Sequence, residues 1–585
     1  MGKLEHVRRL CALADGLVST VAAGQATISA TMAGKSGGAS LSVSTIATGG
    51  SLATLPELPR SVPSATASAP SRVVRIPAGG DLQAALNAAQ PGDELRLAGG
   101  ATWTANYTLP SRACSAVDRW ITVRTDIDDS QLPGPSARIT PSFAGRLARI
   151  VSNTNEAAIR TTGPACGWRF LGLEILGSSP NTTVNYGILK LGDGGWAGGG
   201  DIQLSLDKVP QDFIVDRVYL HGTDSTNTTR CLALNSGRSA VVNSWLDNCH
   251  ARGFDSQAIE GWNGPGPYLI ENNFLAGAGE NVMFGGSDPG IANLSPSDIT
   301  IRHNHVWKDP AWKGVWTVKN LFELKHARRV LVEGNVFENN WAAAQQGMAI
   351  VLKTLSDNAS APWTQTADVT FRYNIVRNSP RGLNVQGMDY SSGGIGIPVA
   401  RVRAENNLFE GIGVFNGTES GWLNLVTHNP SDIAIVHNTM VHNTSYGLSV
   451  VMDYGNGQAR RLQIDDNVFT APSGYAVFYS GGAIGSAALT QEASTTWSFA
   501  RNIVGGVEDQ FASKHPAESW YPTSISGIGF SNPGSGDYRL AAGSPYKGKG
   551  SAGTDPGADF DELARRTAGA KVSASGSVVA AMLRR

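Results

Sequence analysis

Residues 301–353 read IRHNHVWKDPAWKGVWTVKNLFELKHARRVLVEGNVFENNWAAAQQGMAIVLK, and they hold two copies of one pattern, ITIRHNHV (299–306) and VLVEGNVF (330–337). In each copy a run that alternates apolar and other residues leads to an asparagine, then to one further residue, then to an apolar residue. Alternation with a period of two is typical of β-strands. The pattern therefore predicts a strand that ends in a turn at the asparagine.

The same pattern recurs through most of the chain at intervals of 29 to 39 residues. The asparagine slot is filled by Asn273, Asn304, Asn335, Asn374, Asn407, Asn438, Asn467 and Asn502. A solenoid explains both the period and its looseness, because each repeat forms one rung and length differences become loops. Asparagines at a fixed slot can stack and hydrogen-bond along the ladder, so we assign them a structural role.

A second strand precedes each asparagine slot by about twelve residues or more, as in NLFELK (320–325) and MAIVLK (348–353). Near the start, residues 73–103 read as a strand, a short amphipathic helix over 82–89, a Pro-Gly-Asp turn and another strand. An element of this kind closes the end of a solenoid, where the first rung would otherwise expose apolar side chains and open strand edges.

These features resemble right-handed parallel β-helix proteins of the pectate-lyase-like superfamily, and the resemblance covers residues 72–570. It implies an all-β fold, a single-stranded solenoid of about a dozen rungs with an N-terminal helical cap. We expect residues 571–585 to form a loose tail.

The N-terminal part reads differently. Residues 13–46, which include GLVSTVAAGQATISAT, resemble the C-terminal half of a bacterial Ig-like domain of the second Big family. This implies a bacterial protein that is secreted or on the cell surface, with the rest of the domain and any export signal upstream. We expect residues 1–12 to be disordered or non-native, and residues 47–71 to be a linker rich in Pro, Ser and Ala.

The chain carries 47 Lys and Arg against 48 Asp and Glu, and only 16% of its residues are charged. This balance argues against general nucleic-acid binding. No stretch approaches the roughly 20 apolar residues of a membrane span. We expect a monomer with no membrane-spanning segment.

The five cysteines show no spacing typical of a zinc site. Cys231 with Cys249, and Cys114 with Cys166, are candidate disulfides of an exported protein. Buried free thiols are the alternative for each pair, and Cys11 is left over.

Between Arg302 and Arg329 there are seven Lys and Arg but only two acids, with three tryptophans among them. Such a basic, aromatic patch suits an acidic polysaccharide better than a neutral small molecule. The residues expected to bind substrate are Trp262, Trp307, Trp312, Trp316, Lys313, Lys319 and Arg328.

Lys325 and Lys353 occupy the same slot on consecutive second strands, which in a parallel sheet lie about 4.8 Å apart. Repulsion between two such ammonium groups depresses the pKa of one of them unless an anion lies between them, and a depressed pKa suits a general base. β-Elimination on a uronate needs such a base, together with cationic groups that stabilise the developing charge. The alternative is a solvated lysine ladder paired with Glu323 or a loop acid.

The stretch FELKHARRVLVEGNVF is also similar to the alginate lyase and chondroitinase B family of polysaccharide lyases. That similarity implies that Lys325 is the base and Glu323 a calcium ligand. The Arg-His-Gly of that family is absent from the next rung, where Lys353 lies nearest. His326 is a candidate for protonating a leaving oxygen.

Carboxylates offer a competing site. Glu260, Glu280, Asp288 and Glu323 lie on or beside successive second strands. They could bind Ca²⁺, or provide the acid and base of a glycoside hydrolase or uronate epimerase. The NTD, GHG and RIK signatures of polygalacturonases and the DPHD motif of alginate epimerases are absent. A surface adhesin that binds polysaccharide without cleaving it is the third hypothesis.

Overall fold

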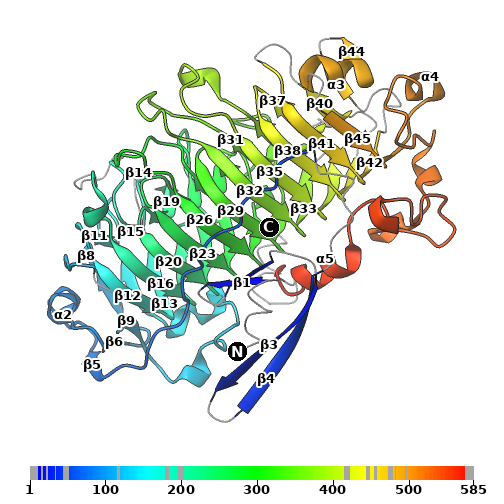
Figure 1. The fold of residues 1–585 in the computed structure, drawn as a ribbon. Coiled ribbons are helices and arrows are strands. Elements are labelled where there is room, and N and C mark those ends of the chain that lie inside the picture. Colours follow the sequence, from blue (N-terminus) through cyan, green and yellow to red (C-terminus); the bar gives the residue numbers. More distant parts are fainter. Residues whose placement is uncertain are drawn as a thin grey trace.

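The computed structural model confirms the predicted parallel β-helix (Figure 1). Three long sheets run the length of the coil, and successive strands of the chain enter them in a fixed order. The structure describes residues 52–114, 119–177, 184–195, 203–413, 422–442, 448–452, 457–471, 478–480, 482–493 and 497–572, together with the backbone of four strands between residues 11 and 43.

We number the sheets in the order in which each rung enters them. Sheet I has 14 strands: β5 (Arg72–Ile76), β6 (Asp93–Ala98), β9 (Ile121–Asp126), β12 (Cys166–Leu171), β16 (Gln211–Asp216), β20 (Gly237–Val242), β23 (Gly266–Glu271), β26 (Ser297–Arg302), β29 (Ala327–Glu333), β32 (Thr366–Arg372), β35 (Ala400–Glu405), β38 (Ser431–Val436), β41 (Arg460–Asp465) and β45 (Trp497–Ala500).

Sheet II has 13 shorter strands: β7 (Thr102–Thr104), β10 (Ala148–Val151), β13 (Leu173–Leu176), β17 (Tyr219–His221), β21 (Trp245–Cys249), β24 (Phe274–Gly277), β27 (His305–Trp307), β30 (Val336–Glu338), β33 (Ile375–Ser379), β36 (Leu408–Ile412), β39 (Thr439–His442), β42 (Val468–Thr470) and β46 (Ile503–Gly505).

Sheet III has 13 strands: β8 (Tyr107–Leu109), β11 (Ile159–Thr161), β15 (Leu189–Leu191), β19 (Arg230–Leu234), β22 (Gln257–Gly261), β25 (Glu280–Phe284), β28 (Phe322–Leu324), β31 (Met348–Lys353), β34 (Arg381–Gln386), β37 (Trp422–Thr427), β40 (Leu448–Met452), β43 (Phe478–Ser480) and β44 (Ala483–Ile484). Its neighbours pair in parallel except β43 with β44.

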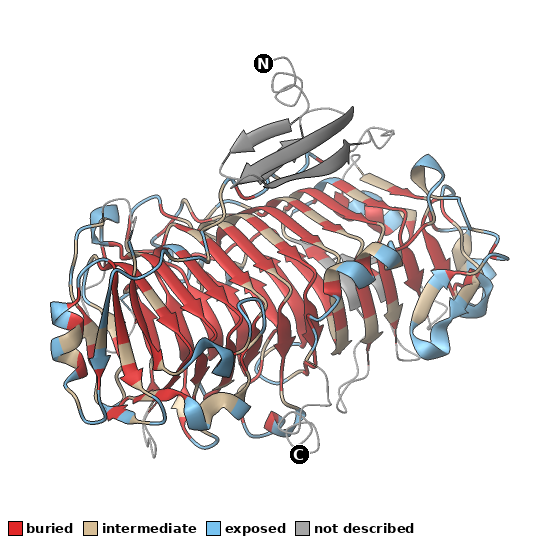
Figure 2. Cartoon of the chain, turned by 90° about the horizontal axis from the view of Figure 1, so that it is seen from below, coloured by how far each residue is buried: buried red, intermediate tan, exposed pale blue. Residues whose placement is uncertain are grey.

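Strand alternation fills the inside of the coil with apolar side chains. Most strand residues of the three sheets are accordingly buried (Figure 2). Phe322 of β28 pairs with Ile350 of β31, and both point into the core. Phe337, Phe371 and Phe409 stack along the coil with ring centroids 5.8 and 6.4 Å apart. Like side chains therefore repeat from rung to rung, and each rung buries the apolar face of its neighbour.

The eight slot asparagines form the ladder that the sequence predicts. From Asn273 to Asn467, each Nδ2 donates to Oδ1 of the asparagine on the next rung, at 2.9 to 3.1 Å, and the ladder ends at Asn502. The same Oδ1 also accepts the backbone N–H of the preceding asparagine. All eight side chains are fully buried, so the ladder satisfies groups that water cannot reach.

The residue before each slot asparagine adopts a left-handed backbone conformation. This set comprises Asn272, His303, Gly334, Tyr373, Asn406, His437, Asp466 and Arg501, with φ between 52° and 67°. One left-handed residue turns the chain sharply from sheet I into sheet II. Asn, Asp and Gly, which tolerate this conformation best, fill half of these positions.

Helices close the two ends of the coil. Helix α2 (Leu82–Ala88) begins after Asp81, whose side chain accepts the N–H of Ala84, and buries Leu82 and Leu86 against the first rungs. Helix α3 (Ser486–Ala493) buries Ala488 and Leu489 at the other end. The predicted N-terminal cap is therefore present. Two further helices, α4 (Asp509–Ala512) and α5 (Phe560–Thr567), lie in the C-terminal segment.

The predicted linker lies extended across the outer face of sheet I (Figure 1). The backbone N–H groups of Thr54, Glu57 and Arg60 donate to carboxylates on every second strand, at 2.9, 3.1 and 2.9 Å. The acceptors are Asp432 of β38, Asp368 of β32 and Asp298 of β26. Three extended residues span about 9.5 Å, which matches two strand spacings of about 4.8 Å.

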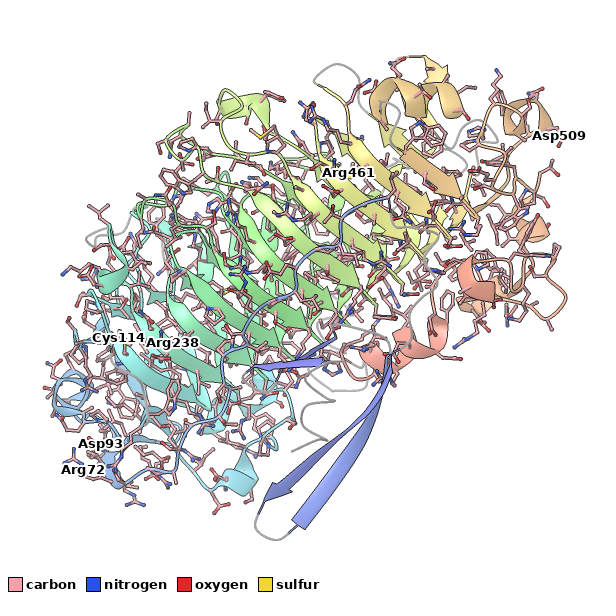
Figure 3. All side chains as sticks on the ribbon, viewed as in Figure 1. Arg72, Asp93, Cys114, Arg238, Arg461 and Asp509 are labelled. Atoms are coloured by element: carbon pink, nitrogen blue, oxygen red, sulfur yellow. A yellow bond between two sulfur atoms is a disulfide. The ribbon has the colours of Figure 1, made fainter. Side chains whose placement is uncertain are left out.

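Each of these carboxylates also pairs with an arginine on the next strand. Asp298 binds Arg329 at 2.7 and 3.0 Å, and Asp368 binds Arg401 at 2.6 and 2.8 Å. Asp432 likewise binds Arg461, and the pair Asp212–Arg238 repeats the arrangement nearer the N-terminal end; Arg238 and Arg461 are labelled in Figure 3. The ion pairs hold the carboxylates in position for the strap, our name for residues 52–67.

The C-terminal segment runs back along the ridge of left-handed residues. Gly557 donates to Asp466 O, and Ala568 O contacts Nε2 of His303 at 2.5 Å. Lys571 Nζ reaches Glu338 at 2.7 Å, and residues 573–585 of the predicted tail lie outside the described residues. This segment therefore ties rungs of the second half of the coil to rungs near its middle.

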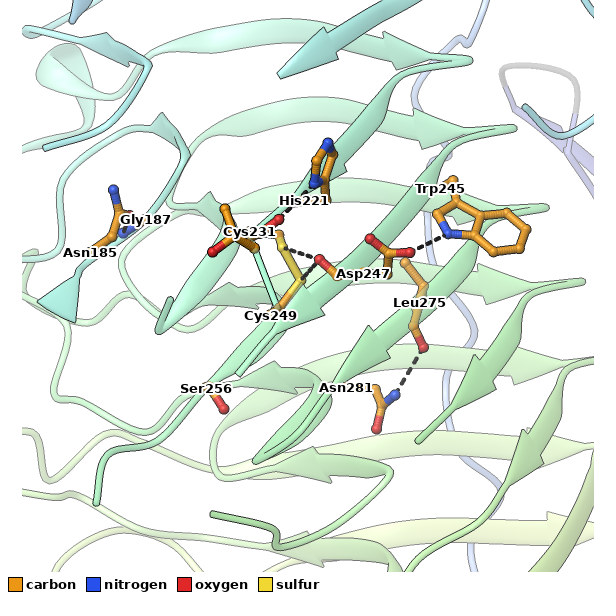
Figure 4. The surroundings of a disulfide bond; sticks show 12 residues. Asn185, Gly187, His221, Cys231, Trp245, Asp247, Cys249, Ser256, Leu275 and Asn281 are labelled. Atoms are coloured by element: carbon orange, nitrogen blue, oxygen red, sulfur yellow. Dashed lines mark hydrogen bonds between the residues drawn. A yellow bond between two sulfur atoms is a disulfide. The ribbon is translucent and has the colours of Figure 1, made fainter. Parts of the chain in front are cut away.

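Both candidate cysteine pairs are disulfides. Cys231 on β19 bonds to Cys249 on β21 inside the coil, and both are fully buried (Figure 4). Cys114 bonds to Cys166 at the start of β12. The first bond links sheets III and II across one rung, and the second fixes the loop after β8 to sheet I.

The N-terminal strands β1 (Cys11–Ala14) and β2 (Leu17–Thr20) pair antiparallel, as do β3 (Gly24–Met32) and β4 (Lys35–Val43). These two small sheets do not establish an Ig-like sandwich, so that assignment stays a prediction. Residues 1–10 lie outside the described residues. Two further small sheets pair β14 (Val184–Asn185) with β18 (Asn227–Thr228), and β47 (Phe530–Asn532) with β48 (Asp537–Leu540). Over the described residues, no helix has the length and apolar character needed to span a bilayer.

Candidate functional site

Charged side chains gather on the outer face of sheet III around strands β22, β25, β28 and β31. Alternation along β28 sends Phe322 and Leu324 into the core and Glu323 outward. Leu324 pairs with Leu352, so the lysines that follow them, Lys325 and Lys353, take the same place on adjacent rungs. The register that the sequence predicts for the two lysines is therefore observed. We call this group the charged cluster; its members are Arg230, Asp255, Glu260, Glu280, Lys319, Glu323, Lys325, Lys353 and Asp389.

Glu323 is held as a carboxylate. Its Oε1 lies 3.1 Å from Nζ of Lys353, and its Oε2 accepts a hydrogen bond from Asn320 at 2.9 Å. Burial opposes the charge, but Lys353, Lys325 and Lys319 outweigh it and lower the pKa of Glu323 to about 2. Lys353 also lies 3.0 Å from Oδ2 of Asp389, so two carboxylates share its charge.

Lys325 is different, because no carboxylate among the described residues lies within ion-pair distance of it. Its side chain is only 6% exposed. Burial opposes its charge, but Glu323, Glu280, Asp255 and Glu260 surround it and raise its pKa above the usual lysine value. The sequence suggested a lysine with a depressed pKa as general base; for Lys325 the shift has the opposite direction, because acids rather than a second ammonium group are its nearest charges.

Glu280, the first residue of β25, is fully buried. Gln257 donates to its Oε2 at 2.7 Å, whereas Oε1 has no hydrogen-bond partner among the described residues and lies 3.6 Å from Nζ of Lys319. Burial, then the charges of Asp255 and Glu323, raise the pKa of Glu280 to about 7. Near neutral pH this carboxyl can therefore both accept and donate a proton.

Two further pairs complete the charged cluster. Glu260 of β22 is fully buried and forms an ion pair with Arg230 of β19, and burial raises the pKa of Glu260. Lys319 forms an ion pair with Asp255, whose side chain is 40% exposed. Solvent therefore reaches the cluster at Asp255, while the glutamates lie deeper.

Lys308 supports the cluster from below. It is fully buried, and its Nζ donates to the carbonyls of Gly277, Ala278 and Gly279 at 2.8, 2.9 and 2.7 Å. These three residues form the turn that leads into Glu280. Gly279 O also accepts the backbone N–H groups of Lys319 and Asn320. Lys308 thus fixes the backbone that carries Glu280 and the residues beside it.

His326 and Asp288 lie outside this arrangement. Nε2 of His326 contacts Ser287 O at 3.1 Å, and burial lowers the pKa of His326 to about 4. Its imidazole is therefore neutral at physiological pH. Asp288 accepts hydrogen bonds from Ser356 and from the backbone and side chain of Ser360, so it holds the loop over 356–360.

The structure corrects the expectation that tryptophans line the binding surface. Trp262, Trp307, Trp312 and Trp316 are between 3% and 7% exposed, so none presents a free ring face. Trp316 stacks on His250 with ring centroids 3.6 Å apart, and Trp312 meets the same imidazole edge-on. The tryptophans anchor loops to the coil, because burying their large apolar area stabilises the folded loops.

The basic residues that were expected to bind substrate lie at different places in the structure. Lys319 belongs to the charged cluster, and Lys313 is exposed on the loop before it. Arg328 lies on β29 of sheet I and donates to Trp363 O at 3.2 Å, on a different face of the coil. The basic run in the sequence is therefore not one patch.

The predicted calcium ligands do not fit a metal ion. Among the described residues, no three His, Cys, Asp or Glu side chains lie close enough together to hold one. Glu260, Glu280 and Glu323 are each placed beside a cation, namely Arg230, Lys319 and Lys353. Asp288 is occupied by the loop over 356–360. Ammonium and guanidinium groups take the place that a cation would need.

Comparison with known proteins gives matches to solved structures alone. No protein-family model matches the chain, and no curated protein matches it in sequence. The chain is similar to an alginate lyase from Paenibacillus sp. str. FPU-7, at 13% identity over 66% of this chain and 95% of that chain, with a TM-score of 0.25.

Two further solved structures are similar at the same level. For the PL6 family alginate lyase AlyGC the identity is 12% over 77% of this chain and 53% of that chain, with a TM-score of 0.38. For the pectate lyase Pel9A it is 11% over 85% of this chain and 98% of that chain, with a TM-score of 0.27. We assign the fold of this chain from its own strand pairing. The activities in these names are those of the matched proteins.

Proposed function

We propose that this protein binds and cleaves an acidic, uronate-containing polysaccharide by β-elimination at the charged cluster. The observation that carries the proposal is the pair formed by Lys325 and Glu280. Over the part of the chain that the structure describes, Lys325 keeps a positive charge without a carboxylate within ion-pair distance, and one carboxyl oxygen of Glu280 accepts no hydrogen bond; the pKa of Glu280 is about 7. A cation that is not engaged in a direct ion pair, together with a proton-transfer group, is what elimination on a uronate requires.

In this scheme Lys325 binds the uronate carboxylate and stabilises the charge that develops on it. Glu280, ionised, removes the proton from the carbon next to that carboxylate. The electron pair forms a carbon–carbon double bond as the glycosidic C–O bond breaks at the adjacent carbon. Glu280 then returns its proton to the leaving oxygen. The products are a chain with an unsaturated uronate at its non-reducing end and a chain with a new reducing end.

The assignment gives Lys325 an electrostatic role, because its raised pKa suits a permanent cation better than a base. Lys353 keeps Glu323 ionised, and Glu323 in turn contributes to the raised pKa of Glu280. The two disulfides support a site of action outside the cytoplasm, since such bonds persist in oxidising compartments.

Hydrolysis is the second candidate, favoured by a separate observation. Glu280 and Glu323 lie on adjacent strands with pKa values of about 7 and about 2, so one is an acid near neutral pH while the other stays ionised. Carboxyl groups whose pKa values are pushed apart mark the acid and base of many glycosidases.

The deciding experiment follows product formation from alginate, polygalacturonate, hyaluronan and chondroitin sulfate, with and without a calcium chelator. Ultraviolet absorbance of unsaturated ends reports elimination, and a reducing-end assay reports either reaction. We expect absorbance and reducing ends to rise together in the wild type and to be lost in Glu280→Gln and Lys325→Met, with Lys313→Met as the exposed control. Reducing ends without absorbance would establish hydrolysis, and retardation of a polymer without any product would leave a binding protein.

A further inference from the structure

Two exposed aromatic side chains lie beside the charged cluster. Among the described residues, the large apolar side chains that are more than about a third exposed include only two aromatic ones, Phe254 at 42% and Tyr390 at 43%. Neither was singled out by its sequence context. Exposed aromatic rings on a folded protein are a recurrent feature of binding surfaces.

Each ring is tied to the charged cluster through its neighbour in the chain. Phe254 precedes Asp255, which forms an ion pair with Lys319. Tyr390 follows Asp389, whose Oδ2 lies 3.0 Å from Nζ of Lys353. Both rings are therefore held at the rim of the charged cluster by ion pairs to its own lysines.

The two rings lie at opposite ends of the charged cluster. Phe254 comes just before β22, and Tyr390 comes just after β34. Strands β22, β25, β28, β31 and β34 are consecutive neighbours in sheet III, so four strand spacings, about 19 Å, separate their levels. Glu280, Glu323 and Lys353 lie on the strands in between, and Lys325 directly follows β28.

Tyr390 is also oriented. Its ring and the imidazole of His428 form an edge contact, with centroids 5.2 Å apart and ring planes at 80°. An edge contact fixes the ring without covering both of its faces. The exposed face remains available to a ligand.

We infer that Phe254 and Tyr390 are stacking platforms at the two ends of a track that binds an acidic oligosaccharide across the charged cluster. The inference rests on the proposed function and adds the length and course of the binding site. A span of four strand spacings requires a ligand of several sugar units. The apolar C–H face of a sugar ring stacks on an aromatic face, while its carboxylates meet Lys325 between the platforms.

The platforms can be tested cleanly because their exposed rings contribute little to the core. Affinity gel electrophoresis of the full chain in alginate, polygalacturonate, hyaluronan and chondroitin sulfate would measure binding. We expect Phe254→Ser and Tyr390→Ser each to weaken binding of the retarding polymer about three- to tenfold, and the double variant more. Phe254→Trp and Tyr390→Phe should bind like the wild type. Ile525→Ser, exposed but in the C-terminal region, is the matched control.

The outcomes separate the track from the reaction. Weaker binding in the serine variants without turnover in any protein supports the track and overturns the proposed cleavage. Turnover with unchanged affinity in the double variant overturns the track and leaves the cleavage standing. Absence of retardation in all four polymers overturns both. A second readout is length dependence: the wild type should prefer hexasaccharides to disaccharides of the same polymer, and the double variant should lose that preference.

Discussion

The Nζ atom of Lys353 lies 3.1 Å from Oε1 of Glu323, a carboxylate that is fully buried on the preceding rung. A buried carboxylate is stable only when a partner compensates for its lost hydration. Lys353 supplies that compensation, so its first role is to keep Glu323 ionised. Lys353, which takes the same place as Lys325 on the next rung, therefore acts on the carboxylate of Glu323.

Replacing Lys353 with Met should destabilise the protein near neutral pH. The pKa of Glu323 is about 2 in the folded state against an ordinary value of 4.5, so its stabilisation is present above pH 4.5 and is lost as the pH falls towards 2. At about 1.4 kcal/mol per pKa unit this shift represents a few kcal/mol. In urea unfolding, Lys353→Met should have a lower free energy of unfolding than the wild type at pH 7, and this difference should shrink at pH 3. Lys353→Arg should keep the pH dependence of the wild type. An equal deficit at both pH values would contradict the ion pair.

Replacing Glu280 with Gln should stabilise the protein at alkaline pH while abolishing product formation. The pKa of Glu280 is raised from 4.5 to about 7, so the folded state binds the extra proton, and stability is lost as the pH rises from 4.5 through 7. The charged groups that face Glu280 are Asp255, Lys319, Glu323, Lys325 and Lys308. The melting temperature should fall less between pH 5 and pH 8 for Glu280→Gln than for the wild type. Glu518→Gln, an exposed control, should follow the wild type.

Replacing Lys308 with Met should cost at least about 3 kcal/mol of stability, because the carbonyls of Gly277, Ala278 and Gly279 lose their donor in a site that water cannot reach. The loss should appear in the unfolding midpoint in urea. Lys313→Met removes a lysine from the same loop at an exposed position and should change stability by less than about 0.5 kcal/mol. Equal midpoints for the two variants would show that the buried ammonium is dispensable.

Gly334 should not tolerate a side chain. It has φ of 67°, and a Cβ there would lie 2.6 Å from Arg566 O of the C-terminal segment. Gly314 has a similar φ of 74° but open space around it, so Gly314→Ala tests the backbone strain alone. Gly334→Ala should therefore lower the melting temperature more than Gly314→Ala, and should speed proteolysis of residues 551–572. Identical melting curves would mean that the C-terminal segment does not pack on the ridge.

Glu57→Pro removes one backbone N–H of the strap while leaving the Asp368–Arg401 ion pair in place. We expect the free energy of unfolding to fall by about 1 kcal/mol, and a protease of broad specificity to cleave the strap faster. Leu58→Pro is the matched control, since the N–H of Leu58 is not among those that bind the aspartates. Equal protease sensitivity of the two variants would argue against the predicted role of the strap contacts.

The coil could be predicted from the sequence because it depends on a short repeating pattern and on contacts between neighbouring rungs. The asparagine slots, the strand before each slot and the shared place of Lys325 and Lys353 follow from a period that neighbouring rungs enforce on one another. The cap at Leu82–Ala88 was likewise visible as a short apolar pattern. These features need no knowledge of the loops.

The site was harder to predict because loops decide it. Lys353 meets Asp389 from the loop after β34, and Trp316 is buried because its loop folds back onto His250. No periodic signal in the sequence reports either contact. The strap did leave a signal, since Asp and Arg alternate at equivalent positions near the start of successive sheet I strands, but composition alone marked residues 47–71 as a linker.

The two segments that cross the rungs determine where a mechanical load enters the molecule. The strap leaves the coil at the level of β38, and the C-terminal segment leaves it near His305, so neither end of the described chain departs from a tip of the rod. Tension applied at either terminus must first strip hydrogen bonds from the flank. The terminal turns, closed by α2 and α3, carry no load until then, and the rod resists being unwound from its ends.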